Sequence, residues 1–222
     1  MKANKFIGDK RFYRMVLMVA IPIMIQNGIT NFVSMLDNIM VGQIGTEQMS
    51  GVAIVNQLMF VFNICIFGAI SGAGIFGAQF YGNGNHEGVR NAFRFKLIIC
   101  GVMALIGIGV FLNFGPQLIS QFLHDVSKVG DIQQTLFYGR EYLKVMLWGM
   151  IPFAIMQAYS STLRETGETL LPMKAGITAV FVNLTFNYIL IFGKCGAPAL
   201  GVKGAAVATV ISRIIECLID RK

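Results

Sequence analysis

This sequence has few charged residues. Of its 222 residues, 13% are Asp, Glu, Lys or Arg, whereas soluble globular chains carry roughly 25%. Hydrophobic residues make up 55%, and they include 18 Phe and 13 Met. A deficit of this size excludes an ordinary soluble domain and indicates a polytopic membrane protein. The net charge is +7, but the basic residues lie in short segments between apolar runs, so they indicate membrane topology and no nucleic-acid partner.

Cysteine and histidine are also scarce, at four and two residues. Three of the four cysteines lie inside apolar runs and none forms a CxxC pair, so we expect neither disulfides nor a cysteine metal site. The chain has no HExxH motif, no Ser/His/Asp arrangement and no intramembrane pair of aspartates. We therefore expect that the protein is not an enzyme and has no cofactor.

Long apolar runs are what the sequence has in abundance. A spanning helix needs about 20 mostly apolar residues. Six segments meet or approach this length: 15–41, 51–80, 93–114, 139–161, 173–193 and 203–219. The runs lack the alternating pattern of barrel strands, which favours helices. We expect an all-α membrane protein, a six-transmembrane-helix bundle over 15–219, with an N-terminal cytoplasmic segment at 1–14 and a truncated C-terminus at 220–222.

Basic residues in the connections predict which side faces the cytoplasm. Twelve Lys and Arg fall on the side that carries both termini and five on the other side, with Lys96 counted in the connection between spans two and three. The side richer in Lys and Arg faces the cytoplasm. We expect a multi-pass protein of the cell membrane (inner or plasma membrane) with both termini cytoplasmic.

Asp37 is the one charged residue between Met15 and Val41. Ionisable residues inside spans are costly, and they usually face the bundle interior or a water-filled cavity on an ion or proton path. A carboxylate there can exchange a proton, or it can bind Na⁺ when neighbouring carbonyl and hydroxyl oxygens complete the shell. The sequence therefore predicts a cation site at Asp37. The alternative is that Asp37 caps a helix end near the outer interface.

Other polar residues lie in spans five and six. Asn183 and Asn187 are four residues apart and share one helix face. Their amides can bind a cation or hydrogen-bond a neighbouring helix, and the spacing does not decide between the two. Thr209 lies among small residues of span six, where Arg213 and Glu216 have the spacing of an ion pair.

Two features concern the backbone. Pro22 removes a hydrogen-bond donor, so we expect it to bend span one about four turns before Asp37. The glycine-rich stretch GAISGAGIFGAQFYGNG, residues 68–84, lies in a span and its exit, where close helix packing is the expected use.

Four stretches of the chain resemble a transporter family. They are IPIMIQNGITNFVSMLDNIMVGQIGTEQMSGVAI at 21–54, GAGIFGAQFYGNGNHEGVRNAF at 72–93, LRETGETLLPM at 163–173, and FVNLTFNYILIFG at 181–193 with PALGVKGAAVATVISR at 198–213. They cover most of the chain, and in this order they resemble the multidrug and toxic compound extrusion (MATE) transporters, especially the bacterial branches.

The resemblance implies one lobe of a two-lobed secondary active antiporter that exports drugs or cationic organic compounds in exchange for Na⁺ or H⁺. Asp37 then matches the acid of the cation site in the N-terminal lobe. Asn183 and Thr209 match other residues of that site, and Pro22 matches the proline at which the first helix bends. Asn187 stands where some members of the family have a second aspartate, so one acid is expected here.

A chain of 222 residues corresponds to one lobe, so the resemblance implies a missing second six-helix lobe, in the same full-length chain or as a second copy. The other expected partners are the lipid bilayer and a small-molecule organic substrate. The nearest alternative is a lipid-linked oligosaccharide flippase of the same superfamily, although such proteins usually have cavity-lining arginines, which spans one to five lack. A non-transporting membrane scaffold or an inactive fragment is the alternative from another class.

Overall fold

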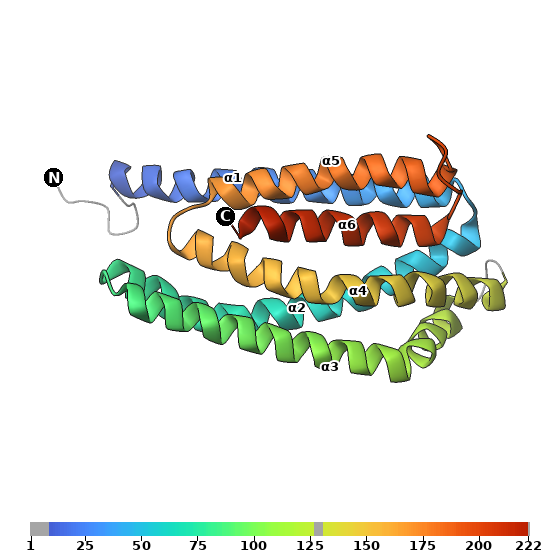
Figure 1. Cartoon of the computed structure of the whole chain (residues 1–222), viewed down its shortest axis with the longest axis horizontal. Coiled ribbons are helices and arrows are strands. Elements are labelled where there is room, and N and C mark those ends of the chain that lie inside the picture. The colour runs from blue at the N-terminus through green and yellow to red at the C-terminus, as the bar shows by residue number, and fades with distance from the viewer. Residues whose placement is uncertain (1–8, 127–130, 222) are drawn as a thin grey trace.

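The computed structural model of the chain is a bundle of six α-helices, and it describes residues 9–126 and 131–221 (Figure 1). The helices are α1 (Lys10–Gly42), α2 (Thr46–Gly82), α3 (His86–Val126), α4 (Ile132–Glu165), α5 (Leu170–Phe192) and α6 (Val202–Asp220). The described residues contain no strand. The all-α, six-helix bundle predicted from the apolar runs is therefore confirmed.

The helices form two layers of three. Figure 1 shows α2, α3 and α4 in one layer and α1, α5 and α6 in the other, and α4 packs against α6 where the layers meet. The α2–α3 and α4–α5 connections lie at the end of the bundle where α1 begins, which we call the N-terminal end. The α1–α2 and α5–α6 connections lie at the opposite end. The core between the layers is apolar and includes Ile66, Met146, Met150 and Ala206, none of which is more than 1% exposed.

Four of the helices are long and apolar enough to cross a membrane: α1, α2, α5, and α3 as far as Phe122. Helices α4 and α6 do not meet this measure. Both are central in the bundle, since α4 packs against α2, α3 and α6 while α6 packs against α4 and α5. Charged side chains of these two central helices can therefore meet protein instead of lipid.

The third helix extends past the end of the predicted span. The apolar run predicts an end at residue 114, whereas α3 runs to Val126 with Pro116 inside it. Figure 1 shows the last part of α3 turned away from the axis of the rest, as expected where a proline removes a backbone donor. After the turn, Asp131 caps α4: its Oδ1 accepts hydrogen bonds from the backbone amides of Gln133 at 2.9 Å and Gln134 at 3.4 Å.

Helices α2 and α4 come into backbone contact at two glycines. A Cβ atom added to Gly51 would lie 2.8 Å from the backbone nitrogen of Gly139 and 2.8 Å from the carbonyl oxygen of Thr135. Neither atom can rotate out of the way, because both belong to the main chain of α4. Small residues at such a crossing let two helices approach closely, so Gly51 fixes the distance between α2 and α4.

We expect Gly51→Ala to destabilise the protein by about 1–3 kcal/mol, because the added methyl group forces the two backbones apart. Gly68→Ala is the matched control, since a Cβ at Gly68 meets nothing within 4 Å and alanine favours the helix. The midpoint of thermal unfolding in detergent measures both variants. Equal midpoints for Gly51→Ala and the wild type would show that the contact does not limit the packing.

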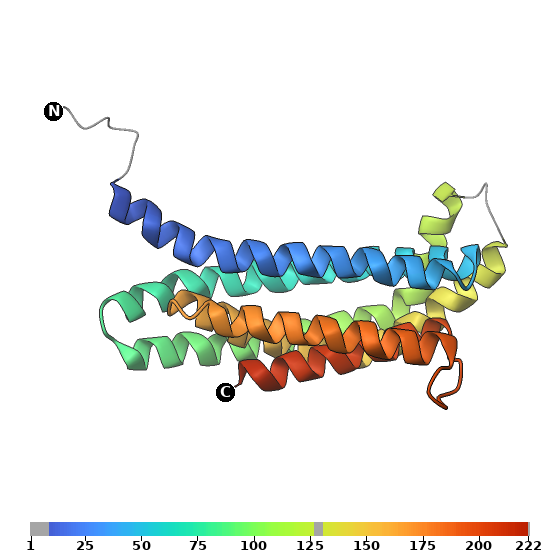
Figure 2. The ribbon, with the colours of Figure 1, turned by 90° about the horizontal axis from the view of Figure 1, so that it is seen from above.

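The first helix is the one least covered by the bundle. Of its 33 residues, four are buried: Pro22, Gln26, Val33 and Val41. It packs mainly along α5 and less against α2. The helix continues through Pro22 without a break, and Figure 2 shows its N-terminal part bending away from the axis of the remainder. That Pro22 causes the bend stays a prediction.

Gln26 attaches α1 to the N-terminal end of the bundle. Its Nε2 donates a hydrogen bond to the carbonyl oxygen of Pro172 at 3.2 Å, and its Oε1 accepts one from Nη2 of Arg164 at 3.0 Å. A Cβ on Gly176 would lie 2.7 Å from the same Nε2, so glycine at this position leaves room for the contact. One buried amide thus joins α1, the end of α4 and the start of α5.

Candidate cation site

The acid predicted to bind a cation faces helix α5. Asp37 lies inside α1, half-buried, and its Oδ1 accepts a hydrogen bond of 2.6 Å from Nδ2 of Asn187. Helix α1 ends at Gly42 with Gln43 as its C-cap, whose backbone amide makes the capping contacts. The alternative that Asp37 caps a helix end is therefore wrong.

The two asparagines of α5 share one face, as their spacing predicted. Asn187 is 1% exposed and Asn183 is 6% exposed. Nδ2 of Asn187 also donates to Oδ1 of Asn183 at 3.1 Å, and Nδ2 of Asn183 lies 3.4 Å from Oγ1 of Thr209 on α6. The structure thus brings together Asp37, Asn183, Asn187 and Thr209, and it leaves Pro22 four turns away along α1.

The orientation of the Asn183 amide changes the chemistry of this cluster. In the orientation above, its oxygen faces only other acceptors, whereas with the amide turned over, Nδ2 donates to both carboxylate oxygens of Asp37 at 3.0 Å. The turned-over orientation satisfies both ends of the amide. The amides of Asn183 and Asn187 can therefore both stabilise the carboxylate.

A further oxygen of the cluster lacks a partner. Oδ1 of Asn187 is buried and has no hydrogen-bond partner among the described residues. An unpaired buried acceptor is costly, at about 1–3 kcal/mol. Carboxylate, amide and hydroxyl oxygens, which Asp37, the two asparagines and Thr209 carry, are the ligand atoms that hard cations prefer. The described residues contain no group of three or more His, Cys, Asp or Glu that could hold a metal ion.

The cluster opens onto a cavity of about 270 Å³. Asp37, Asn187 and Thr209 line it together with Asn56, Tyr142 and Arg213. The buried Tyr142 donates its hydroxyl to Oδ1 of Asn56 at 3.3 Å, which links α4 to α2 on the cavity wall. Five helices therefore contribute polar groups to one space inside the bundle.

Arg213 does not form the ion pair that its spacing suggested. No ion pair joins it to Glu216 among the described residues. Its guanidinium carbon instead lies 4.8 Å from the centroid of the Phe153 ring on α4. Cation–π contact with a neighbouring helix thus replaces pairing along α6. The direct ion pair suggested by the spacing is therefore not formed, although Arg213 and Glu216 interact electrostatically.

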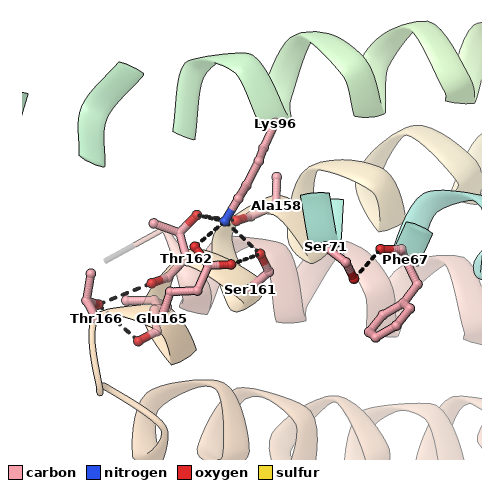
Figure 3. A network of polar contacts seen from close by, with 9 residues as sticks. Phe67, Ser71, Lys96, Ala158, Ser161, Thr162, Glu165 and Thr166 are labelled. Carbon is pink, nitrogen blue, oxygen red and sulfur yellow. Dashed lines mark hydrogen bonds and ion pairs between the residues drawn. The ribbon is translucent and has the colours of Figure 1, made fainter. Parts of the chain in front are cut away.

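A second polar cluster lies toward the N-terminal end of the bundle. Figure 3 shows Lys96 reaching from α3 to α4, where its Nζ donates to Ser161 at 3.0 Å, to Thr162 at 3.2 Å and to the carboxylate of Glu165. Lys96 is 0% exposed. Counting it with the exposed basic residues of the connection was wrong, because it points into the protein, whereas Arg90 and Arg94 of the same helix are exposed. Without it, the count of basic residues becomes eleven against five.

Glycines of α2 make room for this pair. A Cβ on Gly77 would lie 2.7 Å from Oε2 of Glu165, and a Cβ on Gly74 would lie 2.5 Å from Oε1 of the same carboxylate. By contrast, a Cβ on Gly68 or Gly72 would meet nothing within 4 Å. Close packing, which we expected throughout the glycine-rich stretch, therefore holds at Gly74 and Gly77. Beside the pair is a cavity of about 250 Å³, which Arg164 and Gln157 also line.

Comparison with known proteins identifies the family. Residues 22–189 match the MatE family. The probable multidrug resistance protein NorM of Thermotoga maritima is 35% identical over 206 residues, which are 90% of this chain and 42% of that protein. A protein of the same name from Halalkalibacterium halodurans is 30% identical over 214 residues, which are 96% of this chain and 44% of that protein. The chain thus spans less than half the length of these relatives.

The fold also resembles that of solved transporters of this family. The chain is similar to a solved structure described as the outward-facing conformation of a multidrug resistance MATE family transporter of the MOP superfamily, with a TM-score of 0.78. The match is 22% identical and covers 93% of this chain and 43% of that one. The likeness at this identity concerns the fold. Since the family match extends over more than half of the sequence, the chain belongs to the MatE family.

Proposed function

We propose that this chain forms the N-terminal lobe of a secondary antiporter that exports small organic compounds in exchange for Na⁺ or H⁺. The observation that carries the proposal is the contact of Asp37 on α1 with Asn187 on α5, next to a cavity inside a membrane bundle. An acid in such a place is by default an ion-path residue. The relatives named as probable multidrug resistance proteins support a drug as the exported compound.

Cation coupling is assigned to Asp37, Asn183, Asn187 and Thr209. A Na⁺ ion would be held by their carboxylate, amide and hydroxyl oxygens. A proton would bind Asp37 alone, since neither asparagine titrates near neutral pH, so this lobe would carry one proton per cycle at the site. The turned-over Asn183 amide, 3.0 Å from both carboxylate oxygens, would stabilise the site after the cation leaves.

The pathway needs a second six-helix lobe, from the same full-length chain or from a second copy. The length of the relatives supports a longer chain, since this one covers 42% of the first and 44% of the second. The weakly covered α1 supports an additional partner in the membrane, because large apolar side chains such as Met24 and Phe32 are exposed along it. Both termini would face the cytoplasm of a cell-membrane protein, following the excess of basic residues on their side.

A lipid-linked oligosaccharide flippase is the second candidate, because arginines do line cavities in this bundle. Arg213 lines the cavity next to Asp37, and Arg164 lines the cavity beside the Lys96–Glu165 pair. Guanidinium groups bind diphosphates well. Asp37 weakens this candidate, since a carboxylate in the same cavity repels a multiply charged anion.

Transport by the native full-length protein in liposomes tests the proposal. Vesicles loaded with a fluorescent lipophilic cation receive an inward Na⁺ gradient or an inward proton gradient in separate experiments. We expect dye release in at least one of the two, and loss of that release when an ionophore collapses the gradient. Release at the same rate without either gradient would contradict cation-coupled export.

A further inference from the structure

We infer that Arg213 binds the anionic group of the transported compound, so that the protein selects zwitterionic organic molecules over purely cationic ones. The inference rests on the proposed function and adds a substrate class to it. The ligand would place its cationic nitrogen at Asp37, where it replaces the coupling cation, and its carboxylate at Arg213.

The first step is the state of the guanidinium. Arg213 lies half-buried on a membrane helix, and within the described residues it makes neither a hydrogen bond nor an ion pair. Its guanidinium lies over the face of the Phe153 ring and interacts electrostatically with Glu216 and Tyr142, but within the described residues none of its five N–H donors makes a hydrogen bond. A charged side chain inside a membrane bundle usually has a partner. An incoming anion would supply hydrogen-bond acceptors for these donors.

The second step is the position of Arg213 relative to Asp37. Ala205, Thr209 and Arg213 are spaced four apart on α6, and all three line the 270 Å³ cavity that Asp37 lines from α1. Arg213 lies one turn, roughly 6 Å along the helix axis, from Thr209 at the cation site. The two opposite charges share one cavity without touching, because no ion pair joins them. A bound molecule can bridge them.

The third step is the size and chemistry of the space. A volume of about 270 Å³ is slightly below the roughly 300–1,000 Å³ of whole-ligand pockets, so it suits the charged end of a larger compound. A guanidinium binds carboxylate through two parallel hydrogen bonds, and the Phe153 ring already orients it. An ammonium group at Asp37 competes directly with Na⁺ or H⁺, which is what exchange requires.

Binding of a matched pair of dyes tests the inference. The pair is a rhodamine with a free carboxylate, which is a zwitterion at neutral pH, and its methyl ester, which is a cation of nearly the same shape. Fluorescence polarisation with the purified full-length protein gives both dissociation constants. We expect the zwitterion to bind at least about tenfold more tightly than the ester, as charge-assisted hydrogen bonds to the carboxylate predict.

Three variants test whether Arg213 causes the preference for the zwitterionic dye. Arg213→Gln should remove the preference, Arg213→Lys should keep part of it, and Lys194→Gln should leave it unchanged, since Lys194 is an exposed cation outside the cavity. Equal binding of the two dyes by the wild type, or a preference that survives Arg213→Gln, would overturn the inference and leave the proposed function standing. If Arg213→Gln fails to fold, the relative affinity of the wild-type protein for the two dyes still tests the inference.

Two other results distinguish zwitterion transport from the alternative functions. If neither dye binds, both the inference and the proposed drug export are wrong. If a polyprenyl diphosphate displaces the zwitterionic dye while simple amino-carboxylates do not, the guanidinium serves a lipid diphosphate, and the flippase candidate replaces the zwitterion transporter.

Discussion

Asp37→Asn is expected to abolish cation-driven export while the protein still accumulates in the membrane. The substitution keeps the size of the side chain and an oxygen that can accept the hydrogen bond from Nδ2 of Asn187, so α1 should still pack on α5. It removes the charge, and with it the group that exchanges a proton or anchors Na⁺. Because a ligand shifts a conformational equilibrium only through its different affinities for the two states, a cation that no longer binds cannot drive export.

The measurement is gradient-driven dye release from liposomes, which we expect to fall by more than about tenfold. Asp131→Asn is the matched control. It neutralises an acid that is exposed at the start of α4, and asparagine caps a helix as well as aspartate does, so release should be unchanged. Undiminished release by Asp37→Asn, at normal protein levels, would remove the acid from the coupling mechanism.

Lys96→Met is expected to be the most destabilising change outside the cation site, at about 3–5 kcal/mol. It removes the three hydrogen bonds that the ammonium group donates on α4 and leaves the carboxylate of Glu165 beside the glycines of α2 without its counter-charge. Breaking one side of a buried pair is costly because the remaining charge stays away from water. The loss should appear in the SDS-unfolding midpoint in mixed micelles.

Two companion variants identify the cause. Lys144→Met removes a lysine whose side chain is 72% exposed and whose ion pair with Glu141 lies at the surface, so about 0–1 kcal/mol is expected. Lys96→Met combined with Glu165→Gln should recover most of the lost stability, because the amide can still pair with Ser161, which donates to Glu165 at 3.0 Å in the wild type. A double variant no more stable than Lys96→Met would show that packing of the lysine stem, not charge, matters.

The helices could be predicted from apolar run length, since a bilayer imposes a minimum length on every span. The end of α3 could not, because the residues around Pro116 resemble a connection in composition although the backbone stays helical to Val126. Apolar length alone also misses α4 and α6 as spans, although both lie at the centre of the bundle. The local sequence does not show which neighbouring helix will pack against a given residue.

The candidate site was predictable in the parts that depend on spacing within a helix. Asn183 and Asn187 share a face because they are four residues apart, but Asp37 lies 150 residues from Asn187, and only the family resemblance joined them. The Lys96–Glu165 pair spans 69 residues and was missed. Arg213 was assigned to Glu216 by the helical rule, whereas the ring that it contacts belongs to α4.

The two polar attachments of α1 have a mechanical consequence. Between Pro22 and Gly42, the hydrogen bonds from side chains of this helix to other described helices involve Gln26 and Asp37. These residues are 11 positions apart, roughly 16 Å along the axis. Loss of the hydrogen bond at Asp37 would leave Gln26 as the only one of these two polar attachments, and the part of α1 beyond Asp37 would then be held by apolar packing, which includes the buried Val41. Titration of one carboxylate can therefore change how firmly this half of α1 is attached to α5.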